Sequence, residues 1–242
     1  MPAVRIVRNL LLLGLVGFAG LLLYGYARDH PQDMPWTELD LTQPVGAFTG
    51  RKLVGLRGEG GQCRGLLERA GVRFDPLAAR AAGEHCGYDD AVRLRTGGAL
   101  HVAYRPAGLG TACPVAAALA LWEWHVLQPA AIEHFGTRVA AVEHLGSYNC
   151  RRMYGRASGG WSEHATANAI DVAGFRLEDG TRISVLKDWK SEGAKADFLR
   201  AVRNGACPLF ATVLSPDYNA AHADHLHMDQ AARGEMGWRG CS

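Results

Sequence analysis

The stretch SEHATANAIDVAGFRLEDGTRISVLK, residues 162–187, joins a regular structural pattern to two polar groups that the pattern does not need. Two β-rich runs, AIDVAGFRL and TRISVLK, flank an Asp-Gly turn pair and predict a β-hairpin. The first run carries Asp171, and His164 precedes it by seven positions. A carboxylate is rarely buried without a partner, so either Asp171 faces solvent or a positive group lies beside it.

A second polar cluster, HADHLHMD at residues 222–229, holds three histidines and two aspartates. Side chains alternate between the faces of a strand, so His225 and His227 would point to the same face if this segment is extended. These imidazoles, with His164 and Asp171 from the hairpin, can supply a metal site of nitrogen and oxygen ligands. Such ligands suit zinc at about 2.0–2.2 Å, and a catalytic zinc keeps one position open.

Helical patterns surround these strands. Residues 113–128, CPVAAALALWEWHVLQ, have a proline in the first turn and meet Pro129, which predicts a core helix that ends or kinks there. Residues 194–205, AKADFLRAVRNG, predict a second helix with Gly205 as its C-terminal stop. FATVL predicts a further strand, and HLHMD would continue the sheet. We therefore expect an α+β fold with a small, mainly antiparallel sheet flanked by helices.

The N-terminus predicts a membrane segment. Residues 9–27 are nineteen consecutive uncharged residues, preceded by Arg5 and Arg8. A helix of that length can cross about 30 Å of hydrocarbon. A cleaved signal peptide is the alternative, because GYA before Arg28 is a passable cleavage site. Both interpretations leave the N-terminus in the cytoplasm and export the rest of the chain, and we expect a retained transmembrane anchor over residues 1–27.

Residues 28–61 are polar and broken by prolines and the run GEGG, with no sustained helical or strand period. We expect this segment to be a linker, followed by one domain over residues 62–242. The chain of 242 residues has a formal net charge of +2 and lacks a dense block of lysine and arginine. This composition gives little support for nucleic-acid binding, so we expect no nucleic-acid partner.

The exported part carries six cysteines, Cys63, Cys86, Cys113, Cys150, Cys207 and Cys241. An even number in an oxidising compartment predicts up to three disulfides, and the spacing is not that of a structural zinc site. Six cysteines allow many pairings, and the sequence does not choose among them. Our expectation joins Cys63 to Cys86, Cys113 to Cys150 and Cys207 to Cys241.

The two polar clusters together resemble a known motif. They follow the SxHxxGxAxD and (D/E)HxH pattern of the zinc D-alanyl-D-alanine peptidases, whose superfamily includes lysostaphin-type endopeptidases and the Hedgehog signalling domain. The motif positions are Ser162, His164, Ala169, Asp171, Asp224, His225 and His227. More specifically, residues 63–233 resemble the bacterial extensin-like C-terminal family, because SYNCRR, SEHATANAIDVAGFRL, DGTRISVLKDW and PDYNAAHADHLHMD occur in that family's order.

This resemblance implies a zinc-peptidase fold and gives the polar residues roles. His164, Asp171 and His227 would be the zinc ligands. Asp224 would be the general base, and His225 would hydrogen-bond the developing oxyanion or share in proton transfer. Zinc lowers the pKa of the water that it binds toward about 7, and a nearby carboxylate can carry that proton to the leaving amine.

The same resemblance implies residues that bind the substrate. Ser162 would hydrogen-bond the substrate. Arg151 or Arg152 would bind its carbonyl or terminal carboxylate, for which a planar guanidinium is suited. One position departs from the motif, because its glycine is Ala167 here. A methyl group at this place can alter the local backbone, although we expect the ligands to keep their places.

We therefore expect a zinc metallopeptidase anchored in the inner membrane with its domain in the periplasm, a D,D- or L,D-peptidase of peptidoglycan stem or cross-link peptides. The alternative is a non-catalytic zinc-containing module that binds the cell wall or a partner. Asp224 and His225 favour the enzyme, because a structural site needs no base beside its last ligand. His222 and Asp229 would shape the loop or hydrogen-bond the ligand imidazoles.

Overall fold

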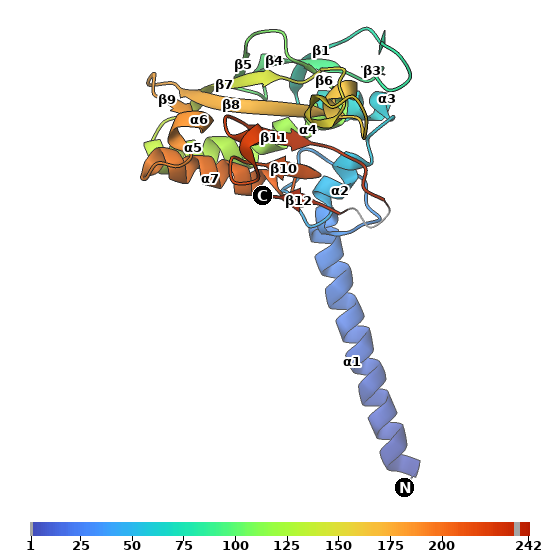
Figure 1. The fold of residues 1–242 in the computed structure, drawn as a ribbon. Coiled ribbons are helices and arrows are strands. Elements are labelled where there is room, and N and C mark those ends of the chain that lie inside the picture. The colour runs from blue at the N-terminus through green and yellow to red at the C-terminus, as the bar shows by residue number, and fades with distance from the viewer. Residues whose placement is uncertain (1, 235–237) are drawn as a thin grey trace.

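The N-terminal helix stands apart from the rest of the molecule. The structure is a computed structural model that describes residues 2–234 and 238–242. The helix α1 (Pro2–Asp29) projects from the folded part as a long rod, with the N-terminus at its far end (Figure 1). None of its residues is buried. Among the described residues it is the one helix long and apolar enough to cross a membrane, which fits a signal segment or an anchor.

Part of the segment that follows α1 packs against the folded domain. It contains the short helix α2 (Thr49–Val54). Leu39, Leu41 and Leu53 belong to the buried hydrophobic core. In this part the linker predicted over residues 28–61 is therefore packed against the domain. Apolar residues that stand singly between polar ones and prolines show no period in the sequence, yet each can still reach the core.

A helical rod runs through the core and continues past Pro129. It consists of α4 (Cys113–Trp122), a π-helical turn η2 (Glu123–Leu127) and α5 (Gln128–Phe135). The predicted core helix is present, but it does not end at the proline. In the π turn a backbone hydrogen bond spans five residues, and this wider turn accommodates a residue that has no N–H and crowds the turn before it.

The central element is a seven-stranded sheet, mainly antiparallel as expected, with parallel pairing of the edge strands β12 and β5. Its strands in spatial order are β12 (Gly240–Cys241), β10 (Thr212–Leu214), β11 (Leu226–Asp229), β8 (Ala169–Leu177), β7 (Val139–Gly146) and β5 (Ala103–Arg105), with β9 (Arg182–Ser184) paired to β8. The predicted hairpin is β8–β9, but its second strand ends at Ser184 and the residues VLK begin a helix instead. The predicted strands in FATVL and HLHMD are β10 and β11. The chain thus has a mixed α+β fold.

Two smaller sheets and several short helices complete the fold. One three-stranded sheet consists of β1 (Val72–Pro76), β4 (Val92–Gly98) and β6 (Gly110–Thr111), and a two-stranded one consists of β2 (Arg80–Ala81) and β3 (Gly87–Tyr88). The remaining helices are α3 (Gly60–Arg69), α6 (Val185–Asp188), α7 (Ala194–Ala206) and the 3₁₀ turns η1 (Pro31–Asp33), η3 (Met153–Gly155), η4 (Glu163–Thr166) and η5 (Ala220–His222).

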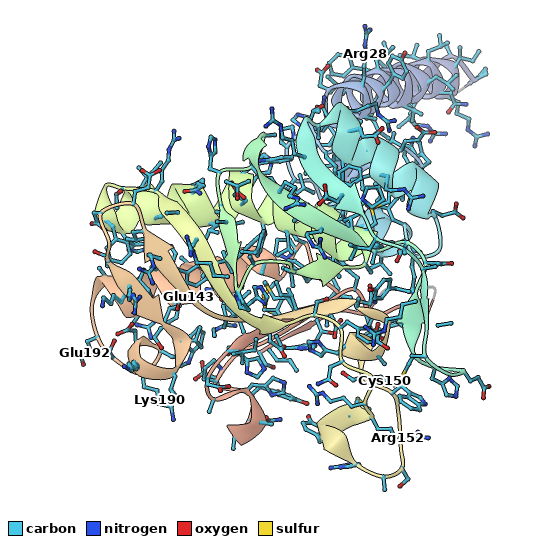
Figure 2. All side chains as sticks on the ribbon, turned by 90° about the horizontal axis from the view of Figure 1, so that it is seen from above. Arg28, Glu143, Cys150, Arg152, Lys190 and Glu192 are labelled. Atoms are coloured by element: carbon cyan, nitrogen blue, oxygen red, sulfur yellow. A yellow bond between two sulfur atoms is a disulfide. The ribbon has the colours of Figure 1, made fainter. Side chains whose placement is uncertain are left out.

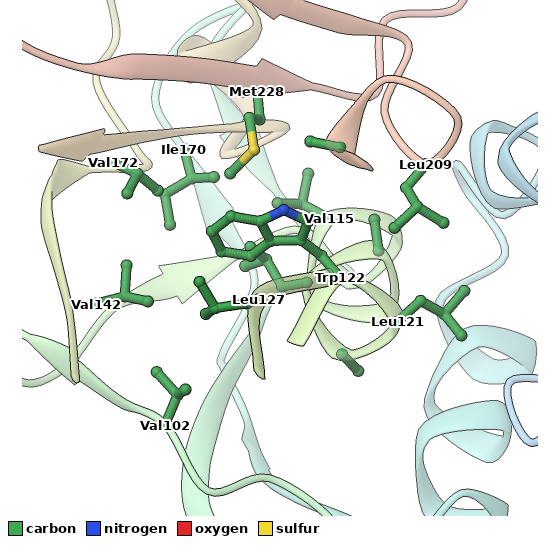
Figure 3. Packing of buried hydrophobic residues seen from close by; sticks show 14 of the residues in the cluster. Val102, Val115, Leu121, Trp122, Leu127, Val142, Ile170, Val172, Leu209 and Met228 are labelled. Carbon is green, nitrogen blue, oxygen red and sulfur yellow. The ribbon is translucent and has the colours of Figure 1, made fainter. Parts of the chain in front are cut away.

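The core is centred on Trp122, the last residue of α4, whose side chain packs between the helix and the sheet. Its ring faces Ile170 and Val172 of β8 and Met228 of β11 (Figure 3). The indole Nε1 donates a hydrogen bond to the carbonyl oxygen of Val202 at 2.9 Å. Burying large apolar side chains stabilises the fold by about 1.5–3 kcal/mol each. This packing fixes one face of β8 and β11 against the core, so their other face is left for the polar side chains.

The predicted role of Gly205 in α7 is wrong. Gly205 was predicted to stop the helix, but α7 continues to Ala206. A Cβ atom at Gly205 would collide with the side chain of Val126 in the π turn. The glycine therefore lets two helical segments approach closely and does not serve as a C-terminal cap.

Three disulfides join distant segments of the domain. Their pairs are Cys63–Cys113, Cys86–Cys150 and Cys207–Cys241, with Cα–Cα distances of 6.0, 5.5 and 5.7 Å. The predicted Cys207–Cys241 bond is confirmed, and the other two predicted pairs are wrong. Cys63 meets Cys113 because α3 packs on α4, and Cys86 meets Cys150 because the β2–β3 hairpin packs on Tyr148 in the loop after β7. Disulfides and an apolar N-terminal helix suggest an extracytoplasmic location.

Candidate metal centre

The register of two strands places two of the predicted ligands side by side. His227 of β11 pairs directly with Asp171 of β8 in the antiparallel ladder. Their neighbours Ile170, Val172 and Met228 point into the core (Figure 3). Since side chains alternate along a strand, Asp171 and His227 both point away from the core on the same side. The apolar neighbours face the core, and this orients the side chains of Asp171 and His227 toward the opposite side of the sheet.

The third predicted ligand comes from the turn η4. The Ser162 hydroxyl caps this turn by accepting a hydrogen bond from the His164 N–H at 3.3 Å. The His164 side chain is buried, and its Nε2 lies 3.2 Å from Asp171 Oδ1 and 3.2 Å from His227 Nδ1. His227 Nδ1 lies 2.9 Å from the same Asp171 oxygen. The three donor atoms therefore form one small triangle, as the sequence predicted.

The turn ends at Ala167 in the backbone conformation that the motif's glycine would adopt. Ala167 has φ 56° and ψ 18°, in the left-handed region, and it is fully buried. Its carbonyl oxygen accepts hydrogen bonds from the Ala112 N–H at 2.9 Å and from the hydroxyls of Thr111 and Ser147 at 3.0 Å each. These bonds hold the strained backbone in place, and His164 still meets Asp171 and His227 with the methyl group present.

We expect Ala167→Val to lower the free energy of unfolding by more than about 2 kcal/mol, because a β-branched residue is disfavoured at positive φ and the site is fully packed. Ala167→Gly is the matched control. Glycine relieves roughly 1–2 kcal/mol of backbone strain, which stabilises the folded state. It also raises the entropy of the unfolded chain and removes a buried methyl group, which both destabilise it. We therefore expect the free energy of unfolding to change by no more than about 1 kcal/mol. Urea unfolding of both variants measures the difference. Equal stabilities would contradict the left-handed turn.

The outer nitrogens of both imidazoles fix where the protons are. His164 Nδ1 donates to the carbonyl oxygen of Ser147 at 2.6 Å, and His227 Nε2 donates to Asp229 Oδ2 at 3.1 Å. In the neutral rings, His164 Nε2 and His227 Nδ1 are then bare acceptors that face each other and the Asp171 oxygen. Three acceptor atoms in contact need either a proton or a metal ion between them. The residues present therefore fit a metal ion, with a carbonyl and Asp229 orienting its imidazole ligands.

The charges of the site follow from this arrangement. Burial alone would raise the pKa of Asp171, but the imidazoles of His164 and His227 outweigh it and hold that pKa well below its usual range. Burial alone would lower the pKa of His227, but Asp171 and Asp229 reverse the effect and raise it to about 9. A proton on His227 is thus the metal-free counterpart of a bound cation. A metal ion must displace this proton.

Zinc affinity is expected to fall as the pH is lowered. Below the pKa of about 9, metal-free His227 holds a proton that zinc must release, so the dissociation constant rises about tenfold for each pH unit between pH 8 and pH 6. Titration against a chelator whose own pH dependence is known measures this slope. A dissociation constant that does not vary over this interval would show that zinc is not held through His227.

His225 faces the site, and Asp224 lies behind it. His225 Nδ1 lies 2.7 Å from Asp224 Oδ1, so it donates to the carboxylate and leaves Nε2 bare. That Nε2 is 3.5 Å from Asp171 Oδ1. The His225 side chain is 11% exposed, whereas that of Asp224 is 52% exposed. Asp224 therefore orients the imidazole, and the basic atom nearest to the ligands belongs to His225.

A cavity of about 750 Å³ opens over the three predicted ligands. Of the predicted substrate-binding residues, Arg151 and Ser162 line it along with His225. Arg152 instead stacks its guanidinium 4.6 Å over the Trp161 ring and donates to the carbonyl oxygen of Gly159. Figure 2 shows Arg152 on the same projecting loop as Cys150. The structure thus favours Arg151 over Arg152 as a group that can reach a ligand in this cavity.

Further cavity residues were not singled out from the sequence as substrate contacts. They are Tyr154, Tyr218, His222 and Arg233. His222 Nδ1 donates to Asn219 Oδ1 at 2.8 Å, and its ring centre lies 5.3 Å from that of His225. Burial, followed by the nearby imidazoles of His227 and His225, lowers the pKa of His222 to about 4, so it is neutral at pH 7. The position of His222 within the cluster HADHLHMD could have indicated that it lies at the cavity. Nothing in the sequence around Arg233 indicates that this residue lines the cavity.

Comparison with known proteins agrees with this geometry at the level of the family. The family described as extensin-like protein C-terminus matches residues 61–242. The chain belongs to this extensin-like C-terminal family. No curated protein and no solved structure matches the chain. The matched range contains all three predicted ligands, Asp224 and His225. It begins after α2, which packs against α4 from outside the matched range.

Proposed function

We propose that the extensin-like domain is a zinc metallopeptidase that hydrolyses amide bonds in the peptide part of peptidoglycan. The observation that carries this proposal is the triangle of His164, Asp171 and His227, whose donor atoms lie 2.9–3.2 Å apart at the base of an open cavity. Two imidazoles and one carboxylate suit zinc. Three protein ligands beneath an open cavity fit a catalytic rather than a purely structural ion.

The chain's own residues can divide the work of hydrolysis. Zinc bound at the triangle would polarise the substrate carbonyl and make water more acidic. His225 Nε2, which lies 3.5 Å from Asp171 Oδ1, would take a proton from the attacking water and return it to the leaving amine. Asp224 keeps that nitrogen bare by accepting the Nδ1 proton. Arg151, on the cavity wall, can bind a carbonyl or carboxylate of the peptide.

The proposed location follows from α1 and the disulfides. Three disulfides and an apolar N-terminal helix support an extracytoplasmic domain. We propose further that α1 is retained in the inner membrane as a single-pass anchor, with the domain in the periplasm. Mass spectrometry of the protein recovered from membranes tests this, because cleavage after Ala27 would remove the helix.

The enzyme proposal is tested with the full-length chain in detergent. Zinc-loaded protein is incubated with purified muropeptides, and new amines and product masses are measured. We expect products that depend on zinc and on His225. A chain that binds one zinc and binds muropeptides but releases no product would instead be a non-catalytic wall-binding module. The masses also identify which bond is cleaved.

A further inference from the structure

A second cavity of about 360 Å³ lies against the metal cavity. The two share Trp161, Ser162 and Glu163 in their walls. The turn η4 separates them, because His164 belongs to the metal triangle whereas Thr166 of the same turn lines the second cavity. A ligand that crosses this ridge would touch both cavities at once.

The opposite wall of the second cavity comes from the β2–β3 hairpin. Glu84 and His85 lie at its tip, and Cys86 ties it through a disulfide to Cys150. The ring centre of His85 lies 5.2 Å from that of Trp161. The hairpin is therefore held beside the turn η4. The hairpin forms one wall of the cavity and the turn η4 forms the other.

The cavity presents charges of both signs. Arg57 comes from the turn after α2, and its guanidinium lies 3.8 Å from Glu163 Oε2. Glu163 Oε2 also accepts a hydrogen bond from Asn168 Nδ2 at 2.6 Å, and Oε1 takes part in neither contact. At 3.8 Å the ion pair is longer than a hydrogen bond, so a ligand carboxylate can engage the guanidinium at closer range.

We propose that this second cavity binds the zwitterionic end of an amino acid on a branch of the peptide substrate. Arg57 binds the carboxylate, and Glu84 with Glu163 binds the ammonium group. This inference rests on the proposed function for the identity of the peptide, but the recognition itself does not require cleavage. Arg57 lies before the matched range 61–242, so the segment that follows α1 contributes the cation of this subsite.

Binding is measured by calorimetry with the full-length, zinc-loaded chain in detergent, carrying His225→Ala to suppress cleavage. The probes are a stem peptide whose third residue is a diamino acid with a free amino-acid end, and the same peptide with that end acetylated and amidated. We expect the free end to bind about tenfold more tightly, less so at high salt because the Arg57 side chain is 45% exposed and that of Glu84, 3.9 Å from His85 Nε2, is 88% exposed.

Two variants and one control locate the effect. Arg57→Gln should reduce the preference to less than about twofold, and Glu84→Gln should weaken it. Arg69→Gln, at the exposed end of α3 outside the cavity, should leave it unchanged. Equal binding of the two probes, no binding of either, or a preference that survives Arg57→Gln would overturn the subsite. A preference that depends on Arg57, without cleavage by the wild-type chain, would keep the subsite and reject the peptidase.

Discussion

Asp171→Asn is expected to weaken zinc binding by about 10²–10³-fold. Structural zinc sites with four protein ligands bind the ion with about 10–16 kcal/mol, so one ligand contributes roughly 2.5–4 kcal/mol there. Asparagine keeps the shape of the side chain but removes the charge that both imidazoles face at 2.9–3.2 Å. The rise in melting temperature that zinc gives the wild-type chain should then disappear at the same zinc concentration.

Metal analysis after dialysis and a chelator titration measure this loss. Asp197→Asn is the matched control, because Asp197 is an exposed residue of α7 that pairs with Arg200 at 3.1 Å. It should hold zinc as the wild type does. Wild-type affinity in Asp171→Asn would mean that the triangle on β8, β11 and η4 is not the zinc site.

His225→Ala is expected to lower kcat for muropeptide cleavage by about 10²–10⁴-fold, the range for loss of a positioned acid or base. The zinc content should stay at the wild-type value, because the three ligands of the triangle are His164, Asp171 and His227. KM should change little if Arg151 and the cavity walls bind the substrate. Kinetics with metal analysis on the same preparation separates a catalytic defect from loss of zinc.

Asp224→Asn gives the comparison that decides which residue is the base. Asp224 acts through His225, and the loss of such an orienting group costs about 10–100-fold, so the variant should retain more activity than His225→Ala. Asp224→Glu should restore part of the loss. If Asp224→Asn were the more damaging change, the carboxylate itself would be the base, as the sequence motif implies.

The central sheet and the metal triangle could be predicted because their signals are local. The run around Asp171 predicts a strand and its turn, and alternation in HLHMD puts His225 and His227 on one face. The motif then connects segments 56 residues apart, which the register of β8 and β11 brings opposite each other. The resemblance to the motif implied which three residues would be ligands, and the structure brings those three residues together.

Other features depend on packing that no local pattern records. The partner of His164 Nδ1 is the backbone carbonyl of Ser147, which any residue could supply. Cys63 bonds Cys113 because α3 lies on α4, and the sequence does not show that contact. The role of Gly205 likewise depends on Val126, far away in the chain. Side-chain identity predicts chemistry, whereas these features follow from the shape of the whole domain.

The short junction between α1 and the domain limits how far the site can reach. A single residue, His30, separates α1 from the turn η1, and Tyr26 Oη donates to Asp33 Oδ2 at 2.7 Å across it. Consecutive Cα atoms are only about 3.8 Å apart, so such a junction adds almost no length. A domain of this size is about 40 Å across. If α1 is retained in a bilayer, as we propose, the cavity can reach only material that lies within about 40 Å of the lipid surface.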